Sequence, residues 1–241
     1  MSTASAARAA RLALERLWPS EPFFDALEHY VALLLDANER INLTRVVEPE
    51  DVARLHLLDA LAALPLLDAL DPARAVDLGS GGGIPGIPLA MARPGVAWTL
   101  VDSVGKKAKL LRGFADELGL TNVTILAERA ETIGRDPAHR ERYDVVTARA
   151  CARLPVLAEL ALPLVRAGGQ LLAWKGPLSQ ADAEVRAGTA VSTMLGGGPV
   201  RLVDAGHAAL GGHRFAIATK LAPTAQRFPR RPGEPARRPL A

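Results

Sequence analysis

A glycine-rich segment that follows a short apolar run is the clearest candidate for a ligand site in this sequence. It reads Asp77-Leu-Gly-Ser-Gly-Gly-Gly-Ile-Pro-Gly86 and leads into a stretch of helical character. Glycines permit a tight turn and a close approach of a ligand to the backbone, and a helix start offers free N–H groups. The spacing of Gly81, Gly83 and Gly86 is typical of nucleotide-binding loops, but spacing alone is a weak signal, and an ordinary strand-to-helix turn is the alternative.

Three features favour a zwitterionic nucleoside such as S-adenosylmethionine over a dinucleotide. Asp77 precedes the first glycine by two residues, where a carboxylate would repel a pyrophosphate but could hold an ammonium group through water. Pro85 and Pro88 remove amide donors that a diphosphate would need. Asp102 ends the next apolar run, roughly 20 residues on, where a carboxylate can accept hydrogen bonds from both ribose hydroxyls. A nicotinamide-dependent oxidoreductase is the disfavoured alternative.

Charged residues also follow the next three apolar runs. Glu131 follows the third run in the segment Glu128-Arg-Ala-Glu131, Arg149 ends the fourth run, and Lys175 ends the fifth. Because ligands of open α/β sheets bind at the carboxyl ends of the strands, we expect these side chains to face one crevice. Arg149 and Lys175 are the candidate catalytic residues, with surface ion pairs as the alternative for each.

The elements that must position these residues are strands alternating with helices. Strands are predicted at Ala75–Leu78, Trp98–Val101, Val123–Ala127, Tyr143–Ala148, Gln170–Trp174 and Arg214–Leu221, and helices at Pro88–Arg93, Lys106–Leu118 and Pro155–Val165. This alternation predicts a mostly parallel sheet with right-handed crossovers. We expect an N-terminal helical cap over residues 1–72, with helices in 6–35 and Pro49–Leu70, then the sheet domain over 73–221, and a basic, disordered tail over 222–241.

Composition and cysteine content exclude several classes of protein. The chain has 241 residues, of which 49% are hydrophobic and 23% charged, as in ordinary globular proteins. Cys151 is the only cysteine, so an internal disulfide or a thiolate zinc cluster is impossible, and we expect a small buried residue rather than a nucleophile. No spacing of ligands predicts a metal site. No apolar run approaches the roughly 20 residues needed to span a bilayer, and no secretory pattern is found, so we expect a cytoplasmic protein without a membrane partner.

Several motifs together make the chain resemble a known family. They are Asn42-Leu-Thr44, His56-x-x-Asp59, the continuation Gly83-Ile-Pro-Gly-Ile-Pro-Leu89 of the glycine segment, Leu100-Val-Asp-Ser103, Lys106-Lys107 and Arg149-Ala. Over roughly residues 38–221, the sequence resembles the RsmG family, also called glucose-inhibited division protein B, which methylates guanine N7 in bacterial 16S rRNA. The Ile-Pro-Gly-Ile-Pro-Leu continuation makes this resemblance specific.

The resemblance implies a class I methyltransferase fold, Rossmann-like with a seven-stranded sheet, and S-adenosylmethionine as methyl donor. The cofactor-binding residues expected from the motifs and the resemblance are Asp77, Gly79, Gly81, Gly83, Ile84, Asp102, Ser103, Ala130, Glu131 and Arg149. In this chain Glu128 stands where relatives commonly carry Ser or Gly, which leaves the adenine contact open.

The substrate implied by the resemblance is 16S rRNA, alone or in the small subunit or its assembly intermediate. The candidate RNA-binding residues are Asn42, Arg45, His56, Lys106 and Lys107. The alternatives are a solvated face for Lys107 and a helix-surface or core position for His56. The tail adds five arginines against one glutamate, which favours contact with a polyanion or a solvated end. We expect a monomer. A small-molecule methyltransferase is disfavoured, because only about 70 residues of cap are available to close a pocket.

Overall fold

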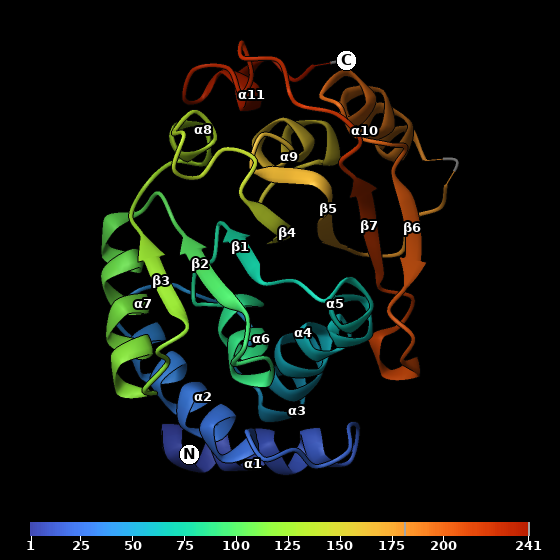
Figure 1. The fold of residues 1–241 in the computed structure, drawn as a ribbon. Helices are drawn as coiled ribbons and strands as arrows, with labels where there is room; N and C mark the ends of the chain where they lie inside the picture. The colour runs from blue at the N-terminus through green and yellow to red at the C-terminus, as the bar shows by residue number, and fades with distance from the viewer. Residues whose placement is uncertain (181, 241) are drawn as a thin grey trace.

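In residues 1–180 and 182–240, which the computed structural model describes, seven strands form a single sheet (Figure 1). The strands are Arg74–Leu78 (β1), Ala97–Val101 (β2), Val123–Leu126 (β3), Tyr143–Arg149 (β4), Val165–Lys175 (β5), Arg201–Asp204 (β6) and Arg214–Thr219 (β7). Their order across the sheet is β3-β2-β1-β4-β5-β7-β6. Strands β1 to β5 pair in parallel, and β7 is antiparallel to both β5 and β6. The predicted mostly parallel α/β sheet is confirmed.

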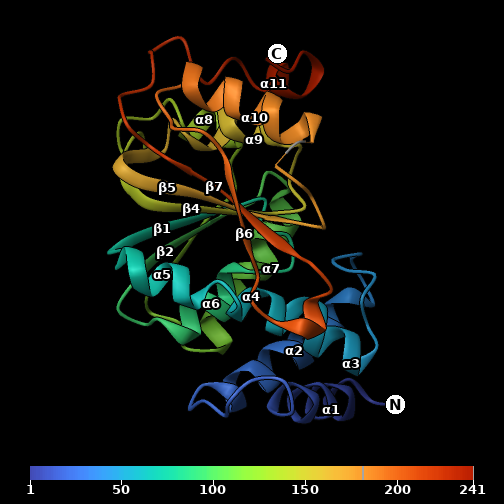
Figure 2. The same ribbon diagram turned by 90° about the vertical axis from the view of Figure 1, so that its right-hand side faces the viewer.

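Helices cover both faces of this sheet (Figure 2). They are Thr3–Glu15 (α1), Phe24–Asn38 (α2), Pro49–Asp51 (α3), Asp59–Leu61 (α4), Leu64–Leu70 (α5), Gly86–Ala92 (α6), Gly105–Glu117 (α7), Ala130–Ile133 (α8), Leu154–Ala161 (α9), Ala183–Met194 (α10) and Glu234–Arg237 (α11), with a π-helical turn at Val52–Leu58 and a 3-10 turn at Ala208–Leu210. In Figure 2, α8 to α11 lie above the sheet, and α2 and α4 to α7 lie below it, with α1 outermost. None of the described helices is both long and apolar enough to cross a membrane.

The central strands are apolar on both faces because both faces are covered. Successive side chains of a strand point to opposite sides of a sheet. In β4, Val145 belongs to the core cluster that includes α2, α6 and α7, whereas Val146 belongs to the cluster that includes α9 and α10. Leu172 and Leu171 of β5 divide in the same way. These continuous apolar runs are typical of a parallel sheet packed between two helical layers.

The strand register brings the predicted site residues to one edge. Leu78 of β1 pairs with Val101 of β2 on one side and with Ala148 of β4 on the other. These three residues therefore lie at the same level of the sheet, and the glycine loop, Asp102 and Arg149 follow directly after them. Arg149 lies opposite Trp174 of β5, and Lys175 lies opposite Arg214 of the antiparallel strand β7.

The N-terminal helices pack as a cap on the lower layer. One face of α1 carries four buried alanines, which allow it to lie close to α2. The sequence predicts one helix over Pro49–Leu70, but the structure divides it into α3, the π-helical turn, α4 and α5. Side chains of α1, α2, α4 and α5 share one core cluster with the sheet. The division of the chain into domains at residue 72 stays a prediction.

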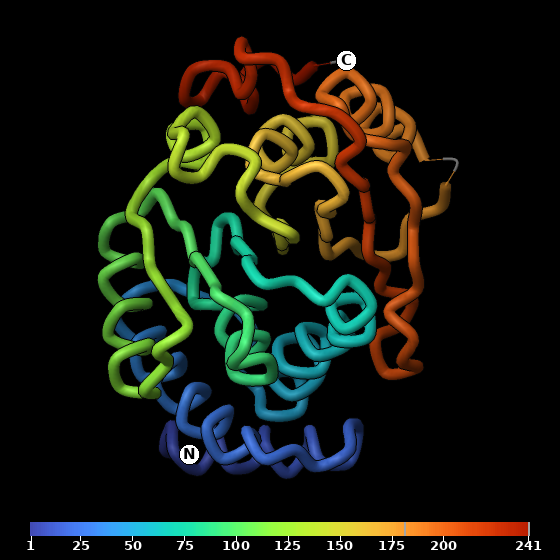
Figure 3. Tube along the Cα trace, viewed as in Figure 1, coloured from blue at the N-terminus to red at the C-terminus, as the bar shows by residue number. Residues whose placement is uncertain are grey.

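The C-terminal segment differs from the predicted disordered tail. Residues 224–240 run back across the upper layer, where Figure 3 shows the red tube passing over α9 and α8. Phe228 is 5% exposed within the core cluster of α9, and Arg230 forms an ion pair with the fully buried Glu159. The prediction of disorder, made from proline and arginine content, was wrong because these partners lie far away in sequence. Residue 241, the last of the predicted tail, lies outside the described residues.

Candidate active site

The glycine loop after β1 adopts backbone conformations that favour glycine. Three of its glycines have positive φ angles, +70° at Gly79, +57° at Gly81 and +100° at Gly83. A Cβ atom on Gly83 would lie only 2.5 Å from Cδ1 of Ile87, so this position has no room for another residue. The hydroxyl of Tyr30 in α2 donates a hydrogen bond of 2.8 Å to the carbonyl of Gly82. The cap thus fixes the loop at the sheet edge.

Asp102 is held by backbone amides on both of its carboxylate oxygens. Oδ2 accepts a hydrogen bond of 2.9 Å from the amide of Gly81, and Oδ1 accepts one of 2.8 Å from the amide of Val104. The residue is 6% exposed. A carboxylate oxygen has two acceptor sites, so each oxygen keeps capacity for a hydroxyl donor. A contact between this carboxylate and a ribose stays a prediction.

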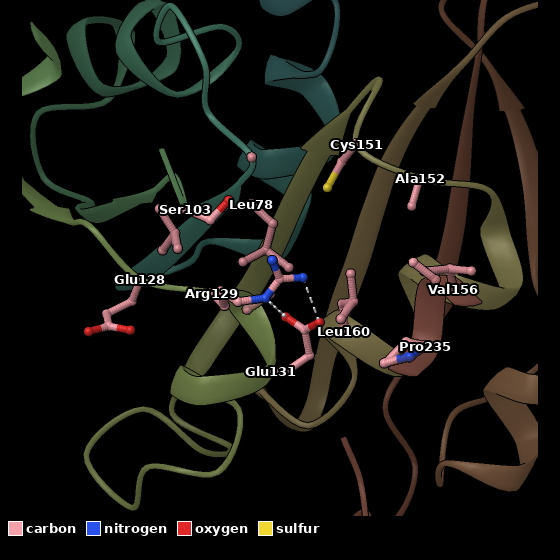
Figure 4. A pocket seen from close by; sticks show the side chains of 14 residues that line it. Leu78, Ser103, Glu128, Arg129, Glu131, Cys151, Ala152, Val156, Leu160 and Pro235 are labelled. Carbon is pink, nitrogen blue, oxygen red and sulfur yellow. Dashed lines mark hydrogen bonds and ion pairs between the residues drawn. The ribbon is translucent and has the colours of Figure 1, made fainter. Parts of the chain in front are cut away.

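A cavity of about 240 Å³, here called the Glu131 pocket, lies between the loops that follow β1, β3 and β4 (Figure 4). Gly79, Ser103, Ala130 and Glu131 line it, together with apolar side chains of α9. These four residues are all among the predicted cofactor contacts. Their convergence supports the prediction of a ligand site at the carboxyl edge of the sheet.

Glu131 is an ionised carboxylate with two donors. Arg129 donates to it, with 3.0 Å between Nη2 and Oε1, and the amide of Gly233 donates to the same oxygen at 2.7 Å. Burial acts to raise the pKa of Glu131, but the hydrogen bonds from Arg129 and Gly233 outweigh burial and lower it. Gly233 belongs to the C-terminal segment, so a distant part of the chain helps to orient this side chain.

Asp77 does not line the Glu131 pocket but lies completely buried below the glycine loop. Its Oδ1 accepts a hydrogen bond of 2.8 Å from the hydroxyl of Thr147 in β4. Its Oδ2 has no hydrogen-bond partner among the described residues. Burial raises the pKa of Asp77 to about 6. The predicted contact between Asp77 and a cofactor ammonium stays a prediction.

Cys151 is exposed, so the prediction of a buried small residue was wrong. It lines the Glu131 pocket, and a Cβ atom on Gly79 would lie 3.0 Å from its Sγ. Desolvation within the pocket, with the negative charge of Asp77 and Asp102, raises the pKa of the thiol to about 11. The thiol is therefore protonated at neutral pH, which disfavours a nucleophile.

Arg149 is fixed by groups from the N-terminal cap. Its Nη1 donates to the carbonyl of Leu55 at 2.6 Å and to Oδ2 of Asp59 at 3.4 Å. Its Nη2 lies 3.3 Å from Nδ1 of His56. An ion pair was the predicted alternative for Arg149, and the pair with Asp59 is present. It does not lie on the surface, however, because the Arg149 side chain is only 20% exposed and Asp59 is buried. The guanidinium is held in one orientation at the sheet edge.

His56 and Asp59, which lie one turn apart as the sequence indicates, are both buried beside Arg149. Nε2 of His56 is 2.8 Å from the hydroxyl of Thr44. Burial and the charge of Arg149 lower the pKa of His56 to about 4, so its ring is neutral at pH 7. Asp59 Oδ1 is also 3.0 Å from Nδ1 of His213.

Arg149 takes part in the lining of two further pockets. The first, of about 200 Å³, is called the Lys107 pocket and is lined by the glycine loop, His56 and Lys107. The second, of about 560 Å³, is called the Lys175 pocket and is lined by Asp59, His213 and Lys175. The Lys107 pocket shares Gly79 with the Glu131 pocket. The three pockets therefore follow one another along the edge of the sheet.

Lys175 lines its pocket but already has an anionic partner. Its Nζ donates to Oε1 of Glu184 at 2.8 Å and to the carbonyl of Ala152 at 3.1 Å. Burial acts to raise the pKa of Glu184, but the hydrogen bonds from Lys175 and from the amide of Leu154, with the nearby positive charge, together outweigh burial and lower that pKa. The ion pair predicted as the alternative for Lys175 is present. A direct contact between Lys175 and substrate stays a prediction.

The predicted RNA-binding residues divide into two groups. His56 and Lys107 line the Lys107 pocket with Arg149. Asn42, Arg45 and Lys106 are exposed outside it, on residues 41–48 and at the start of α7. Of the other predicted cofactor residues, Gly81 and Ile84 also line the Lys107 pocket, whereas Gly83 and Asp102 line none of the three pockets. Contact of any of these residues with RNA stays a prediction.

Several residues of the site were not found from the sequence. They are His213, Trp174 and Glu184 beside the predicted cations, and Gly233, Pro235 and Ala236 beside Glu131. His213 reaches Asp59 because β7 runs antiparallel to β5, and the alternating pattern of β7 does not encode that direction. Among the described residues, no group of three or more His, Cys, Asp or Glu side chains is arranged to hold a metal ion.

Residues 24–208 of the chain match the model of the GidB family, described as "rRNA small subunit methyltransferase G". The chain belongs to this family. The resemblance drawn from the motifs is thereby confirmed.

Relatives in this family align over most of the chain. A protein of Roseiflexus sp. (strain RS-1), named "Ribosomal RNA small subunit methyltransferase G", is 47% identical over 215 residues, which cover 88% of this chain and 89% of the relative. A protein of the same name from Chloroflexus aggregans is 45% identical over 224 residues, covering 92% of each chain. The match therefore includes both the cap and the sheet.

Solved structures of methyltransferases share the fold. The O-methyltransferase TomG from Streptomyces achromogenes, in complex with S-adenosylmethionine, gives a TM-score of 0.56 at 19% identity and covers 86% of this chain and 92% of its own. An O-methyltransferase from Bacillus cereus, in complex with S-adenosylhomocysteine, gives 0.56 at 15% identity, with coverage of 88% and 97%. At these identities the likeness concerns the fold alone, and it confirms the predicted class I methyltransferase architecture.

Proposed function

We propose that this protein transfers a methyl group from S-adenosylmethionine to N7 of a guanine in 16S rRNA of the small ribosomal subunit. Membership of the family supports methylation of this RNA. The observation that carries the proposal is that three neighbouring pockets lie in a row along the sheet edge. The Glu131 pocket and the Lys107 pocket share Gly79, and the Lys107 and Lys175 pockets share Arg149. A cofactor in the first and a base in the next would meet at Gly79.

The Glu131 pocket, together with the nearby carboxylates of Asp102 and Asp77, which do not line it, fits a nucleoside with an amino-acid end. Asp102 is fixed by two amides and retains acceptor sites for ribose hydroxyls. Ala152, Val156 and Leu160 supply an apolar surface for the base. The carboxylate of Asp77 beneath the loop, with one oxygen unpartnered, suits a cationic group rather than a phosphate. When bound, S-adenosylmethionine supplies an electrophilic methyl group on a sulfonium ion.

The proposed reaction requires no general base in the protein. Guanine N7 has a lone pair and carries no proton at neutral pH, so it can attack the methyl group directly. The two side chains nearest to such a role are unsuited to it, since the pKa of His56 is lowered to about 4 and that of Cys151 is raised to about 11. Catalysis would rest on proximity and in-line alignment, which can contribute about 7–11 kcal/mol.

Arg149 and Lys175 would position the substrate rather than exchange protons. The product ring gains positive charge, so a cation would not stabilise it. A guanidinium fixed by Leu55, His56 and Asp59 is instead suited to donate to guanine O6, an RNA phosphate or the cofactor carboxylate. Lys175 would help to shape the wall of the Lys175 pocket, where Glu184 and the carbonyl of Ala152 hold it in place.

The target guanine would lie in a loop or a distorted segment of the RNA. N7 faces the major groove, which in A-form RNA is deep and narrow and closed to side chains. The exposed residues Asn42, Arg45 and Lys106, with Lys107 at the pocket, would contact the surrounding strand. We further propose that the protein acts as a monomer in the cytoplasm, on free rRNA, an assembly intermediate or the small subunit.

The two alternative activities receive no support from the family match. The solved O-methyltransferases share only the fold, and a fold does not determine a substrate. A nicotinamide cofactor is also disfavoured by the buried carboxylate of Asp77 under the loop.

The proposal is tested by identifying the methylated nucleoside. The protein is incubated with methyl-labelled S-adenosylmethionine and either naked 16S rRNA or small subunits that lack the modification, and the RNA is digested and analysed by mass spectrometry. We expect label in 7-methylguanosine, and at least tenfold slower labelling with the Asp102→Ala variant at a cofactor concentration below the Kd of the parent protein. Label in N1- or N2-methylguanosine, or labelling of a small molecule but not of rRNA, would refute it.

A further inference from the structure

The C-terminal segment, residues 224–240, is fixed to the body of the protein by a buried ion pair. Glu159 of α9 is completely buried, and both of its carboxylate oxygens accept hydrogen bonds from Arg230. The backbone amide and Nε of Arg230 donate to Oε1 at 2.9 and 2.8 Å, and Nη2 donates to Oε2 at 2.6 Å. Separating a buried carboxylate from its bidentate partner costs much free energy, because the charge is left buried without a partner. This ion pair therefore holds the segment against α9.

Two arginines of the body hold the backbone of the same segment. Arg135 donates to the carbonyl of Pro229 at 2.7 Å, and Arg140 donates to the carbonyls of Thr224 at 2.6 Å and Phe228 at 2.8 Å. The ring of Phe228 fills part of the core next to α9. The segment is thus attached through its backbone, its charge and its one aromatic ring.

Beyond this attachment the chain reaches the Glu131 pocket. The amide of Gly233 donates to Oε1 of Glu131 at 2.7 Å, and Pro235 and Ala236 line the pocket (Figure 4). In Figure 1, α11 lies next to α8 and α9, the two helices that border the pocket on this side. The wall of the pocket opposite Ser103 and Glu128 is therefore built in part from residues more than 100 positions away from Glu131 in sequence.

We propose that the C-terminal segment is a wall of the cofactor site, and that the Arg230–Glu159 pair positions this wall against the nucleoside of the cofactor. The inference rests on the proposed function, because it takes the Glu131 pocket as the place where the nucleoside binds. It assigns the segment a role different from the one its arginine content favours. Arg230 is engaged inside the protein, while Arg231, Arg237 and Arg238 remain exposed.

The first test compares two neighbouring arginines without any RNA present. Arg230→Ala removes the ion pair, and Arg231→Ala removes an exposed arginine of the same segment. Binding of S-adenosylhomocysteine and of adenosine is measured by calorimetry, and folding by circular dichroism. We expect Arg230→Ala to weaken binding of both ligands at least tenfold, and Arg231→Ala to leave both within twofold. Unchanged affinity in a folded Arg230→Ala variant would overturn the inference.

A second pair of variants decides the matter if Arg230→Ala does not fold. Ala236 is exposed and lines the pocket, whereas Ala225 is exposed at the other end of the segment. Ala236→Trp should obstruct the nucleoside and weaken S-adenosylhomocysteine binding at least tenfold, while Ala225→Trp should not change it. Equal affinities in these two variants would overturn the inference. If the parental protein binds no S-adenosylhomocysteine, the proposed function itself fails, and that outcome is distinct from loss of binding in the variants alone.

Discussion

The two halves of the sheet edge are built on different principles. On the side of β1 to β3, backbone amides and carboxylates form the site. Asp102, for example, accepts hydrogen bonds from the amides of Gly81 and Val104. On the side of β4, β5 and β7, the groups are the cations Arg149 and Lys175 and the imidazole of His213, each tied to a carbonyl or a carboxylate from another element. The first half is suited to a small ligand of fixed shape, and the second is suited to orient an anionic polymer and one of its bases.

This difference predicts that variants will separate into two classes. Substitutions on the β1 to β3 side should change the affinity for cofactor, and those on the β4 to β7 side should change the rate of methyl transfer at saturating cofactor. Arg149 is the strictest case, because the resemblance places it among the cofactor contacts, whereas it lines the Lys107 and Lys175 pockets and not the Glu131 pocket.

The largest effect is expected from Arg149→Ala. The variant loses the guanidinium group that three cap residues hold in place, so the substrate is no longer positioned by it. A misplacement of the substrate by about 1 Å can lower the rate on the order of a hundredfold. We expect a single-turnover rate at least a hundredfold lower, with S-adenosylhomocysteine affinity within about threefold. Arg149→Lys keeps the charge but not the guanidinium group, and should recover little of the rate. A tenfold loss of cofactor affinity instead would move Arg149 to the cofactor side of the comparison.

Asp102→Ala should have the next largest effect, on affinity. Hydrogen bonds to a charged acceptor contribute about 1.5–3 kcal/mol each, so the loss of paired ribose contacts should weaken cofactor binding at least tenfold. Calorimetry with S-adenosylhomocysteine measures this directly. Asp102→Asn keeps the shape and one acceptor oxygen, but its NH2 group would face one of the two backbone amides, so it should also weaken binding. An unchanged dissociation constant for the alanine variant would contradict the ribose assignment.

Asp77→Asn should raise stability above pH 6. The carboxyl ionises at an ordinary pKa of 3.8 when unfolded and at about 6 when folded, because burial disfavours its charge. The folded state therefore holds a proton that the unfolded state has lost, and stability falls as pH rises from about 4 to 6. The neutral variant should escape this fall and be more stable by about 1–3 kcal/mol at pH 8 in urea unfolding, with no difference at pH 4.

A less stable Asn variant at pH 8 would mean that the ionised carboxylate is favoured in the folded protein. The affinity of the Asp77→Asn variant for cofactor tests whether the buried charge has a role in binding. If the buried charge attracts the ammonium of the cofactor, the stabilised variant should bind S-adenosylmethionine more weakly than the parent.

Cys151→Ser should have the smallest effect. The thiol is exposed in the Glu131 pocket but has a pKa raised to about 11, so it is protonated at working pH and offers no thiolate. We expect turnover within a few-fold of the parent. Loss of activity in a folded serine variant would reopen a covalent role for the thiol.

The parts of the molecule that could be predicted from sequence are those set by local patterns. The apolar runs located β1 to β5, and the position of Asp77, Asp102 and Arg149 at strand ends followed from the geometry of parallel sheets. The helix α10 and the strand β6 were not predicted. The segment before β6 contains glycines and a proline that indicate a loop, and β6 is a short strand on the edge of the sheet with no fully buried residue.

The parts that could not be predicted depend on contacts between distant residues. Glu184 pairs with Lys175 only because α10 packs beside α9, and Arg230 is held against the body only because its partner Glu159 lies buried in α9. Composition predicted a solvated tail, since it counts charges without their partners. Cys151 is small and apolar, but the turn after Arg149 places it in a pocket and not in the core.

The pH dependence of the single-turnover rate tests most directly the claim that methyl transfer relies on positioning without a base. His56 has lost its proton well below pH 6, because its pKa is lowered to about 4, and Cys151 keeps its proton to about pH 11. Neither group changes charge between pH 6.5 and 9, and guanine N7 has no proton to lose. With saturating S-adenosylmethionine and rRNA substrate, we predict a nearly constant rate of 7-methylguanosine formation across this interval. A rate that rises tenfold per pH unit would contradict the account.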